Sequence, residues 1–157
     1  MKNRIFALLC AVLLALSCTA CAAKPEKQTC TLTVSCAALT KDLSRLSADK
    51  AALTLPSDGQ IIPTQTVEFE AGRSALDVLK LTAEKNNIPL DIVDGEYVYV
   101  NAIGGLAGLD AGDLSGWMFS RNGEFPEESC AAVTVEPGDE IAFLYTCDMG
   151  ADLGIVW

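Results

Sequence analysis

The sequence predicts an α+β fold in which a sheet of about five to seven strands packs against one principal helix. Residues 29–37 (TCTLTVSCA) alternate apolar and polar side chains with the period of two that is typical of a half-buried strand. Ser74 and Asp77 form a capping-box pattern that opens a helix over residues 75–86. A downstream Asp-Gly pair between two apolar segments favours a β-hairpin. Several strands with one long helix indicate the α+β class.

The other elements are expected in the following order. Residues 38–52 carry leucines at helical spacing, which predicts a short amphipathic helix or a compact loop. The segment at 56–59 (PSDG) is typical of a β-turn, and residues 103–108 are expected to form an apolar loop. Further strands are expected at residues 66–70, 90–93, 96–100, 116–120, 132–135 and 140–145.

Residues 1–21 have the organisation of an export signal. Lys2 and Arg4 form a positive n-region, and residues 5–16 form an apolar segment shorter than the ~20 residues of a membrane-spanning helix. Small residues precede Cys21 and a polar stretch follows it, as in a bacterial lipobox. We therefore expect Cys21 to carry a lipid.

Two alternatives to this site stay open, namely Cys18 as the lipidated residue and an ordinary secretory signal without lipid. With Cys21 as the anchor, residues 1–21 are the lipoprotein signal peptide, 22–28 a tether and 29–157 one domain. The expected location is the cell surface, at the outer face of the bacterial cytoplasmic membrane.

The cysteines of the domain and the expected export together predict a disulfide-stapled fold. We expect a β-grasp-like mixed sheet with its first and last strands parallel at the centre. In this topology Cys36 and Cys147 both end central strands and come within bridging distance, which leaves Cys30 for Cys130. Spacing alone does not choose among the connectivities, so the other two stay open.

Charge and composition exclude several classes of function. The chain has 21 acidic and 11 basic residues and a formal net charge of −10, which disfavours nucleic acid as a partner. It has no histidine, so a Ser-His-Asp triad, a Cys-His pair and a Cys/His zinc site are all impossible. We therefore expect a binding protein with no resident cofactor or metal rather than an enzyme.

Several short segments follow one another over nearly the whole predicted domain. They are CTLTVSC at 30–36, PSDG at 56–59, VEFEAGRSALDVL at 67–79, the loop before Ile103, SGWMF at 115–119, NG at 122–123, PGDEI at 137–141 and YTCD at 145–148. Their order resembles a family of bacterial surface domains similar to the C-terminal domain of transcobalamin and intrinsic factor. Many members are described only as a domain of unknown function. The resemblance implies a β-grasp-like fold and a surface for a corrinoid, which is a cobalamin-like ligand.

A corrin ring requires apolar side chains for its faces and main-chain or amide groups for its polar rim. We expect these from Trp117, Met118, Phe119, Asn122 and Phe125, together with Gly104 and Gly105. Phe119 stands where the family usually has Tyr, and Arg121 stands where it commonly has Val. The same residues are also compatible with a plain core strand and an Asn-Gly turn.

In the vertebrate transporters of this family, the ligand lies between such a domain and a larger helical barrel. A chain of 157 residues leaves no length for that barrel, so we expect a half-site that a partner completes. The alternative function is a protein-interaction or adhesion module of the cell envelope with no small-molecule ligand.

Overall fold

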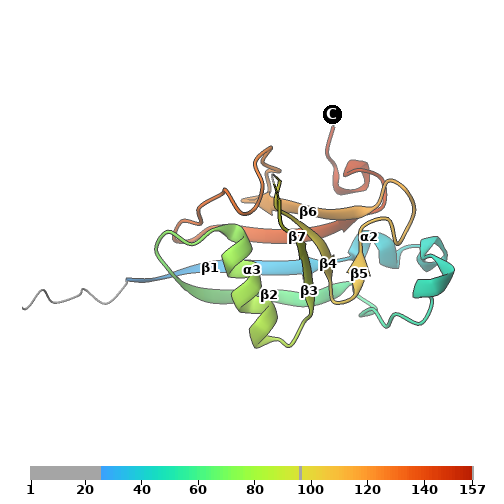
Figure 1. Cartoon of the computed structure of the whole chain (residues 1–157), viewed down its shortest axis with the longest axis horizontal. Coiled ribbons are helices and arrows are strands. Elements are labelled where there is room, and N and C mark those ends of the chain that lie inside the picture. The colour runs from blue at the N-terminus through green and yellow to red at the C-terminus, as the bar shows by residue number, and fades with distance from the viewer. Residues whose placement is uncertain (1–25, 96, 157) are drawn as a thin grey trace, which may run out of the picture.

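The computed structural model describes residues 26–95 and 97–156 (Figure 1). The predicted signal peptide, Cys21 and most of the predicted tether lie outside these residues. Within them, no helix is long and apolar enough to cross a membrane.

A four-stranded mixed sheet forms the base of the domain. Its strands are β1 (Lys27–Ser35), β2 (Gln60–Glu70), β6 (Gly116–Arg121) and β7 (Glu140–Thr146), in the order β2-β1-β7-β6. The two central strands are parallel, with Thr31 opposite Glu140, whereas both outer pairs are antiparallel. The predicted α+β class and the parallel centre are therefore confirmed.

β1 and β2 are longer than the sequence predicts. β1 begins at Lys27, within the predicted tether, because Lys27 lies opposite Glu70 and its Nζ forms an ion pair with Glu68 at 2.8 Å. β2 begins at Gln60 rather than at residue 66 and continues past Pro63. The pairing with β1 shifts register around this proline, which is tolerated because β2 lies at the edge of the sheet.

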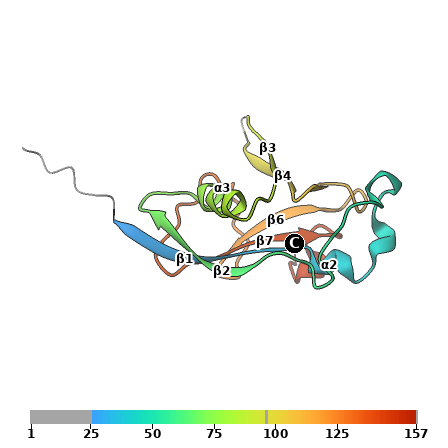
Figure 2. The same ribbon diagram turned by 90° about the horizontal axis from the view of Figure 1, so that it is seen from below.

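The principal helix is α3 (Ala75–Lys85), and it begins as predicted. The Ser74 hydroxyl accepts a hydrogen bond from the Asp77 amide at 3.2 Å, and the Asp77 carboxylate accepts one from the Ser74 amide at 3.0 Å. This capping box satisfies two amides that the first helical turn leaves unpaired. α3 lies on the same side of the four-stranded sheet as β3 and β4 (Figure 2).

A second sheet of three strands was not predicted. It contains β3 (Leu90–Val93), β4 (Tyr99–Ile103) and β5 (Leu106–Ala107), paired antiparallel in that order. The prediction of a strand at residues 96–100 placed β4 too early, because Val98 packs on the core and its carbonyl accepts a hydrogen bond from Ser129. The predicted apolar loop at 103–108 is instead a hairpin whose turn is Gly104-Gly105.

Residues 38–52 agree with the expected short helix or compact loop, whereas the strand expected at residues 132–135 is wrong. Residues 37–50 form three short helical segments, α2 (Ala37–Thr40), η1 (Leu43–Arg45) and η2 (Ala48–Lys50), and a fourth, η3 (Ala151–Leu153), follows β7. No strand forms at residues 132–135, where a single bridge joins Thr134 to Ser74. The Val133 carbonyl accepts a hydrogen bond from the Ala75 amide, so this segment serves the start of α3.

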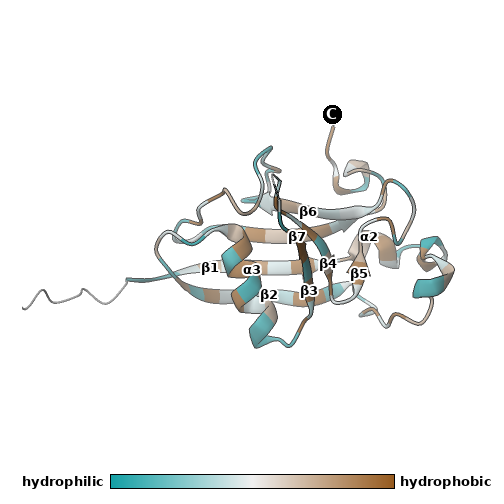
Figure 3. Cartoon of the chain, in the orientation of Figure 1, coloured by the Kyte–Doolittle hydropathy of each residue, from teal (hydrophilic) through white to brown (hydrophobic). Residues whose placement is uncertain are grey.

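The core has two parts, and along the strands apolar residues alternate with polar ones (Figure 3). The larger part lies between the four-stranded sheet, α3 and the second sheet, and it contains Cys30 and Cys130. The smaller part surrounds Tyr145 and contains Cys36 and Cys147.

The predicted disulfide staple is wrong for this structure. All four cysteines are buried free thiols, and no pair lies at bonding distance. They pack as small apolar side chains. Burial raises the pKa of Cys30 and of Cys36 to about 11.

Candidate functional site

An open groove of about 580 Å³ runs along β6, and we call it the β6 groove. Its lining comes from three successive β6 residues, from residues 98–100 of the β4 region, from residues 125–130, and from Phe143 and Ile155. Four of the predicted ligand residues lie together in this lining: Trp117, Met118, Phe119 and Phe125.

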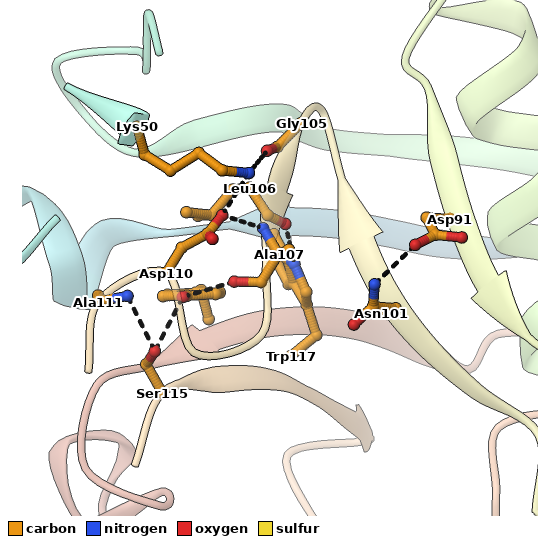
Figure 4. Close-up of polar contacts among 11 residues, drawn as sticks. Lys50, Asp91, Asn101, Gly105, Leu106, Ala107, Asp110, Ala111, Ser115 and Trp117 are labelled. Atoms are coloured by element: carbon orange, nitrogen blue, oxygen red, sulfur yellow. Dashed lines mark hydrogen bonds and ion pairs between the residues drawn. The ribbon is translucent and has the colours of Figure 1, made fainter. Parts of the chain in front are cut away.

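Trp117 is fixed by the core at one end and lines the groove. Its Nε1 donates a hydrogen bond to the Leu106 main-chain oxygen at 2.8 Å (Figure 4). Its ring meets that of Tyr145 edge-on, with ring centroids 5.2 Å apart and planes at 71°. The side chain therefore joins β6 to β5 and β7 while it presents apolar surface to the groove.

Phe119 and Met118 leave β6 on opposite faces. The Phe119 ring lies 5.6 Å from that of Phe143, on the core side. Met118 packs near the turn after β7, because a Cβ added at Gly150 would lie 3.0 Å from the Met118 sulfur and 2.6 Å from Ile155 Cδ1. Residues from both faces of one edge strand thus line a single groove.

Asn122 lies outside the β6 groove and stabilises a turn. It adopts φ +56° next to Gly123 at +80°, the backbone of a two-residue hairpin turn. Its Nδ2 donates to Asp139 at 2.8 Å, and its Oδ1 accepts from the Glu140 amide at 2.8 Å. The side chain lines an adjacent, more polar groove of about 700 Å³ that also contains Arg121.

Asp139 is the buried anion of this turn. Arg121 Nε lies 2.8 Å from one carboxylate oxygen, which also accepts a hydrogen bond from the Glu136 amide at 2.8 Å. Burial alone would raise the pKa of Asp139, but the hydrogen bonds from Glu136, Asn122 and Arg121 outweigh it and hold the pKa below its ordinary value. Arg121 is consequently occupied by an internal partner.

Gly104 and Gly105 do not line the β6 groove. Their φ angles are +63° and +86°, as a two-residue hairpin turn requires. A Cβ on Gly105 would lie 3.2 Å from Leu53, and the Gly105 oxygen accepts a hydrogen bond from Lys50. The turn instead sets β5 where its Leu106 carbonyl reaches Trp117 (Figure 4).

Several groove residues were missed by reasoning from the sequence. Tyr99 is 52% exposed although it lies on a strand, and Glu127 and Glu128 form an acidic border. The alternation of exposed tyrosines with valines over residues 97–100 was a signal that could have identified the β4 side. Nothing in the local sequence shows that residues 127–128 lie beside β6.

The β6 groove is suited to holding an apolar surface. Its lining includes aromatic rings from Tyr99, Trp117, Phe119, Phe125 and Phe143. Its charged residues are all acidic, and among the described residues no cluster of three cysteine, aspartate or glutamate side chains is arranged to hold a metal ion. Such a surface binds flat apolar groups through burial and shape.

Similarity to the solved structure of haptocorrin supports the fold. The chain is similar to haptocorrin in complex with Cbi, with a TM-score of 0.56 and 15% identity over 78% of this chain and 26% of haptocorrin. The chain thus spans about a quarter of haptocorrin. A second similar structure is a proposed metal-binding protein from Ruminococcus gnavus, with a TM-score of 0.44, 18% identity and coverage of 76% and 96%. No curated protein matches the chain.

One region of the chain matches a protein-family model. Residues 72–146 match the family model described as a domain of unknown function, DUF4430. This region includes α3, the second sheet, β6 and all of β7, so it contains most of the β6 groove. The chain therefore has a transcobalamin-like fold, as its sequence predicted, and residues 72–146 resemble a domain of unknown function.

Proposed function

We propose that this protein is an exported, lipid-anchored binding protein that holds a corrinoid in the β6 groove. The observation that carries the proposal is the aromatic groove beside an edge strand, in a fold shared with haptocorrin in complex with Cbi. The function is binding rather than catalysis.

The groove and a corrin ring have matching chemistry. The ring is broad and flat, with apolar faces and amide groups around its rim. Trp117, Phe125 and Tyr99 offer apolar surface for one face, and polar main chain at the strand edge is available for the amides. An open groove of about 580 Å³ covers only part of so large a ligand. A partner in the cell envelope completes the site in this proposal.

The experiment that tests ligand binding is a titration of the full chain with cobinamide and with cobalamin, followed by visible absorbance and calorimetry. We expect saturable binding, and Phe125→Ala should weaken it roughly tenfold through lost apolar contact. Leu43→Ala, at an exposed leucine outside the groove, is the matched control. Absence of saturation at millimolar ligand would overturn the corrinoid proposal, and equal binding by Phe125→Ala would move the site elsewhere.

Export and anchoring rest on the sequence of residues 1–21 and need a separate test. Cells expressing the chain would be fed an alkyne-labelled fatty acid, and the label on the protein would be measured. Cys21→Ser should abolish labelling and release the protein from membranes, whereas Cys18→Ser should leave both unchanged. The reverse pattern would assign the lipid to Cys18. If the unsubstituted protein takes up no label, residues 1–21 act as a plain secretory signal.

A further inference from the structure

The outer edge of β6 presents main-chain groups that have no strand partner. β6 is the last strand of its sheet, and the Asn122 amide points toward β7, where it donates to the Glu140 oxygen at 2.8 Å. The neighbouring Arg121 amide points the other way, to the Glu124 oxygen at 2.8 Å. Since successive residues of a strand alternate between edges, the amides and carbonyls of Phe119 and Trp117 also point away from β7.

These groups open onto the β6 groove. Within residues 26–95 and 97–156, no main-chain hydrogen bond joins Trp117 or Phe119 to a segment on that side. Both residues also line the groove with their side chains. The edge therefore offers a short ladder of donors and acceptors next to apolar surface, the combination used when a domain adds a peptide strand to its sheet.

The opposite edge of the same sheet is protected against such pairing. On β2, Pro63 lacks an amide proton, the register shifts around it, and Glu68 and Glu70 project from the exposed part of the strand. Each of these devices discourages strand addition. Residues 116–120 of β6 have no proline, no register shift and no charge. Of the two edges of this sheet, the β6 edge is therefore the one suited to pairing with an added strand.

The charges around the groove indicate what kind of strand fits. Glu127 and Glu128 line it, Glu124 begins the neighbouring segment, and all three are exposed. No lysine or arginine is among the lining residues, and the nearby Arg121 is paired with Asp139. A second copy of the chain would bring these acidic residues together, so a cationic partner is favoured over self-association.

We propose that the β6 edge binds an extended, cationic segment of another protein, which adds a fifth strand beside Trp117 and Phe119. Its main chain pairs with these two residues, an apolar side chain enters the β6 groove, and flanking lysines or arginines lie near Glu127 and Glu128. This inference goes beyond corrinoid binding, and it predicts that the peptide and a corrinoid compete for the groove.

The test uses the full chain and three synthetic peptides, without corrinoid. The peptides are KVTVTVK, the same sequence N-methylated at alternate residues, and EVTVTVE. We expect KVTVTVK to bind and to slow hydrogen exchange at the Trp117 and Phe119 amides at least about tenfold. The Met118 amide, which points toward β7, should be unchanged. The methylated and acidic peptides should bind much more weakly.

Charge variants distinguish binding of the cationic peptide at Glu127 and Glu128 from its general attraction to an acidic protein. Glu127→Gln/Glu128→Gln should weaken binding of KVTVTVK roughly three- to tenfold. Asp49→Asn/Glu84→Gln changes the net charge equally at exposed positions outside the groove, and it should leave binding unchanged. Equal losses in both variants would overturn the assignment of the acidic border.

The main proposal is overturned if KVTVTVK does not bind at millimolar concentration, if methylation has no effect, or if the two edge amides gain no protection. None of these results depends on corrinoid, whose binding is followed separately by visible absorbance. Failure of either proposal is therefore recognised independently of the other.

Discussion

The indole Nε1 of Trp117 donates a hydrogen bond to the main-chain oxygen of Leu106 at 2.8 Å, and this contact ties β6 to the hairpin formed by β4 and β5. Leu106 is fully buried, so its carbonyl has no access to bulk water. Trp117 is thus both a structural tie and a groove residue.

Trp117→Phe should lower the free energy of unfolding by about 1–3 kcal/mol, because it leaves a buried acceptor unpaired. Urea denaturation of the variant and the parent chain measures the difference. An unchanged midpoint would mean that the Leu106 carbonyl finds another donor when the indole is removed.

The Asp139 carboxylate should make the stability fall in acid. Its pKa is lower in the folded chain than in the unfolded chain, so the unfolded state binds the proton more readily. The contribution is complete above the unfolded value of about 3.9 and is lost as the pH falls through the folded pKa.

Asp139→Asn should reduce the free energy of unfolding at pH 7 by about 1.5–3 kcal/mol. It should also make the free energy of unfolding fall less steeply between about pH 5 and pH 2. Denaturation midpoints over this range would be compared with those of Asp49→Asn, which alters an exposed acid on η2. A variant curve parallel to that of the parent would show that another group carries the acid dependence.

Two glycines with similar backbones should respond differently to alanine. Gly59 has φ +74°, and a Cβ there would lie 2.5 Å from the main-chain N and Cα of Ala37. Gly72 has φ +83° with open space around it. Gly59→Ala should cost more than about 3 kcal/mol, whereas Gly72→Ala should cost about 1–2 kcal/mol from backbone strain alone. If thermal denaturation shows that the two variants lose equal stability, the close approach of Gly59 to Ala37 would be contradicted.

The buried thiols should resist alkylation in the native protein. A pKa of about 11 for Cys30 and Cys36 leaves a thiolate fraction at pH 8 that is roughly 100-fold below that of an ordinary cysteine. Iodoacetamide labelling followed by peptide mass mapping should detect little native reaction and full reaction of Cys30, Cys36, Cys130 and Cys147 in denaturant. Lack of label after denaturation would instead establish disulfides.

Much of the fold was predictable because its signals are local. The alternation over β1 and the Ser74–Asp77 capping box each depend on a few adjacent residues, and both appear as expected. The antiparallel pairing of β3 with β4 was predicted from the Asp94-Gly95 signal and is confirmed, whereas their separation from the main sheet was not predictable, because it depends on how β4 packs on the core. The disulfide prediction was wrong for a related reason. The number of cysteines and the expected compartment do not set the distance between the cysteine side chains.

The candidate site was predictable in part. Trp117, Met118, Phe119 and Phe125 are neighbours in sequence, and the structure brings them into one groove. Asn122 and the glycine pair look like polar ligands in sequence, but positive φ angles commit them to turns. Tyr99 lies in an alternating Tyr-Val segment that carries a local signal, whereas Ile155 reaches the groove through tertiary packing, for which its own segment carries none.

The parallel pairing of β1 with β7 also dictates when the domain can fold. Thr31 and Glu140 are neighbours in the finished sheet, although most of the chain lies between them. During synthesis, β1 has no partner on that side until residues 140–146 have emerged, and contacts of such long separation form slowly. The four-stranded sheet therefore cannot be completed until its last strand has been made, so a chain that lacks β7 should leave β1 with β2 as its one strand partner.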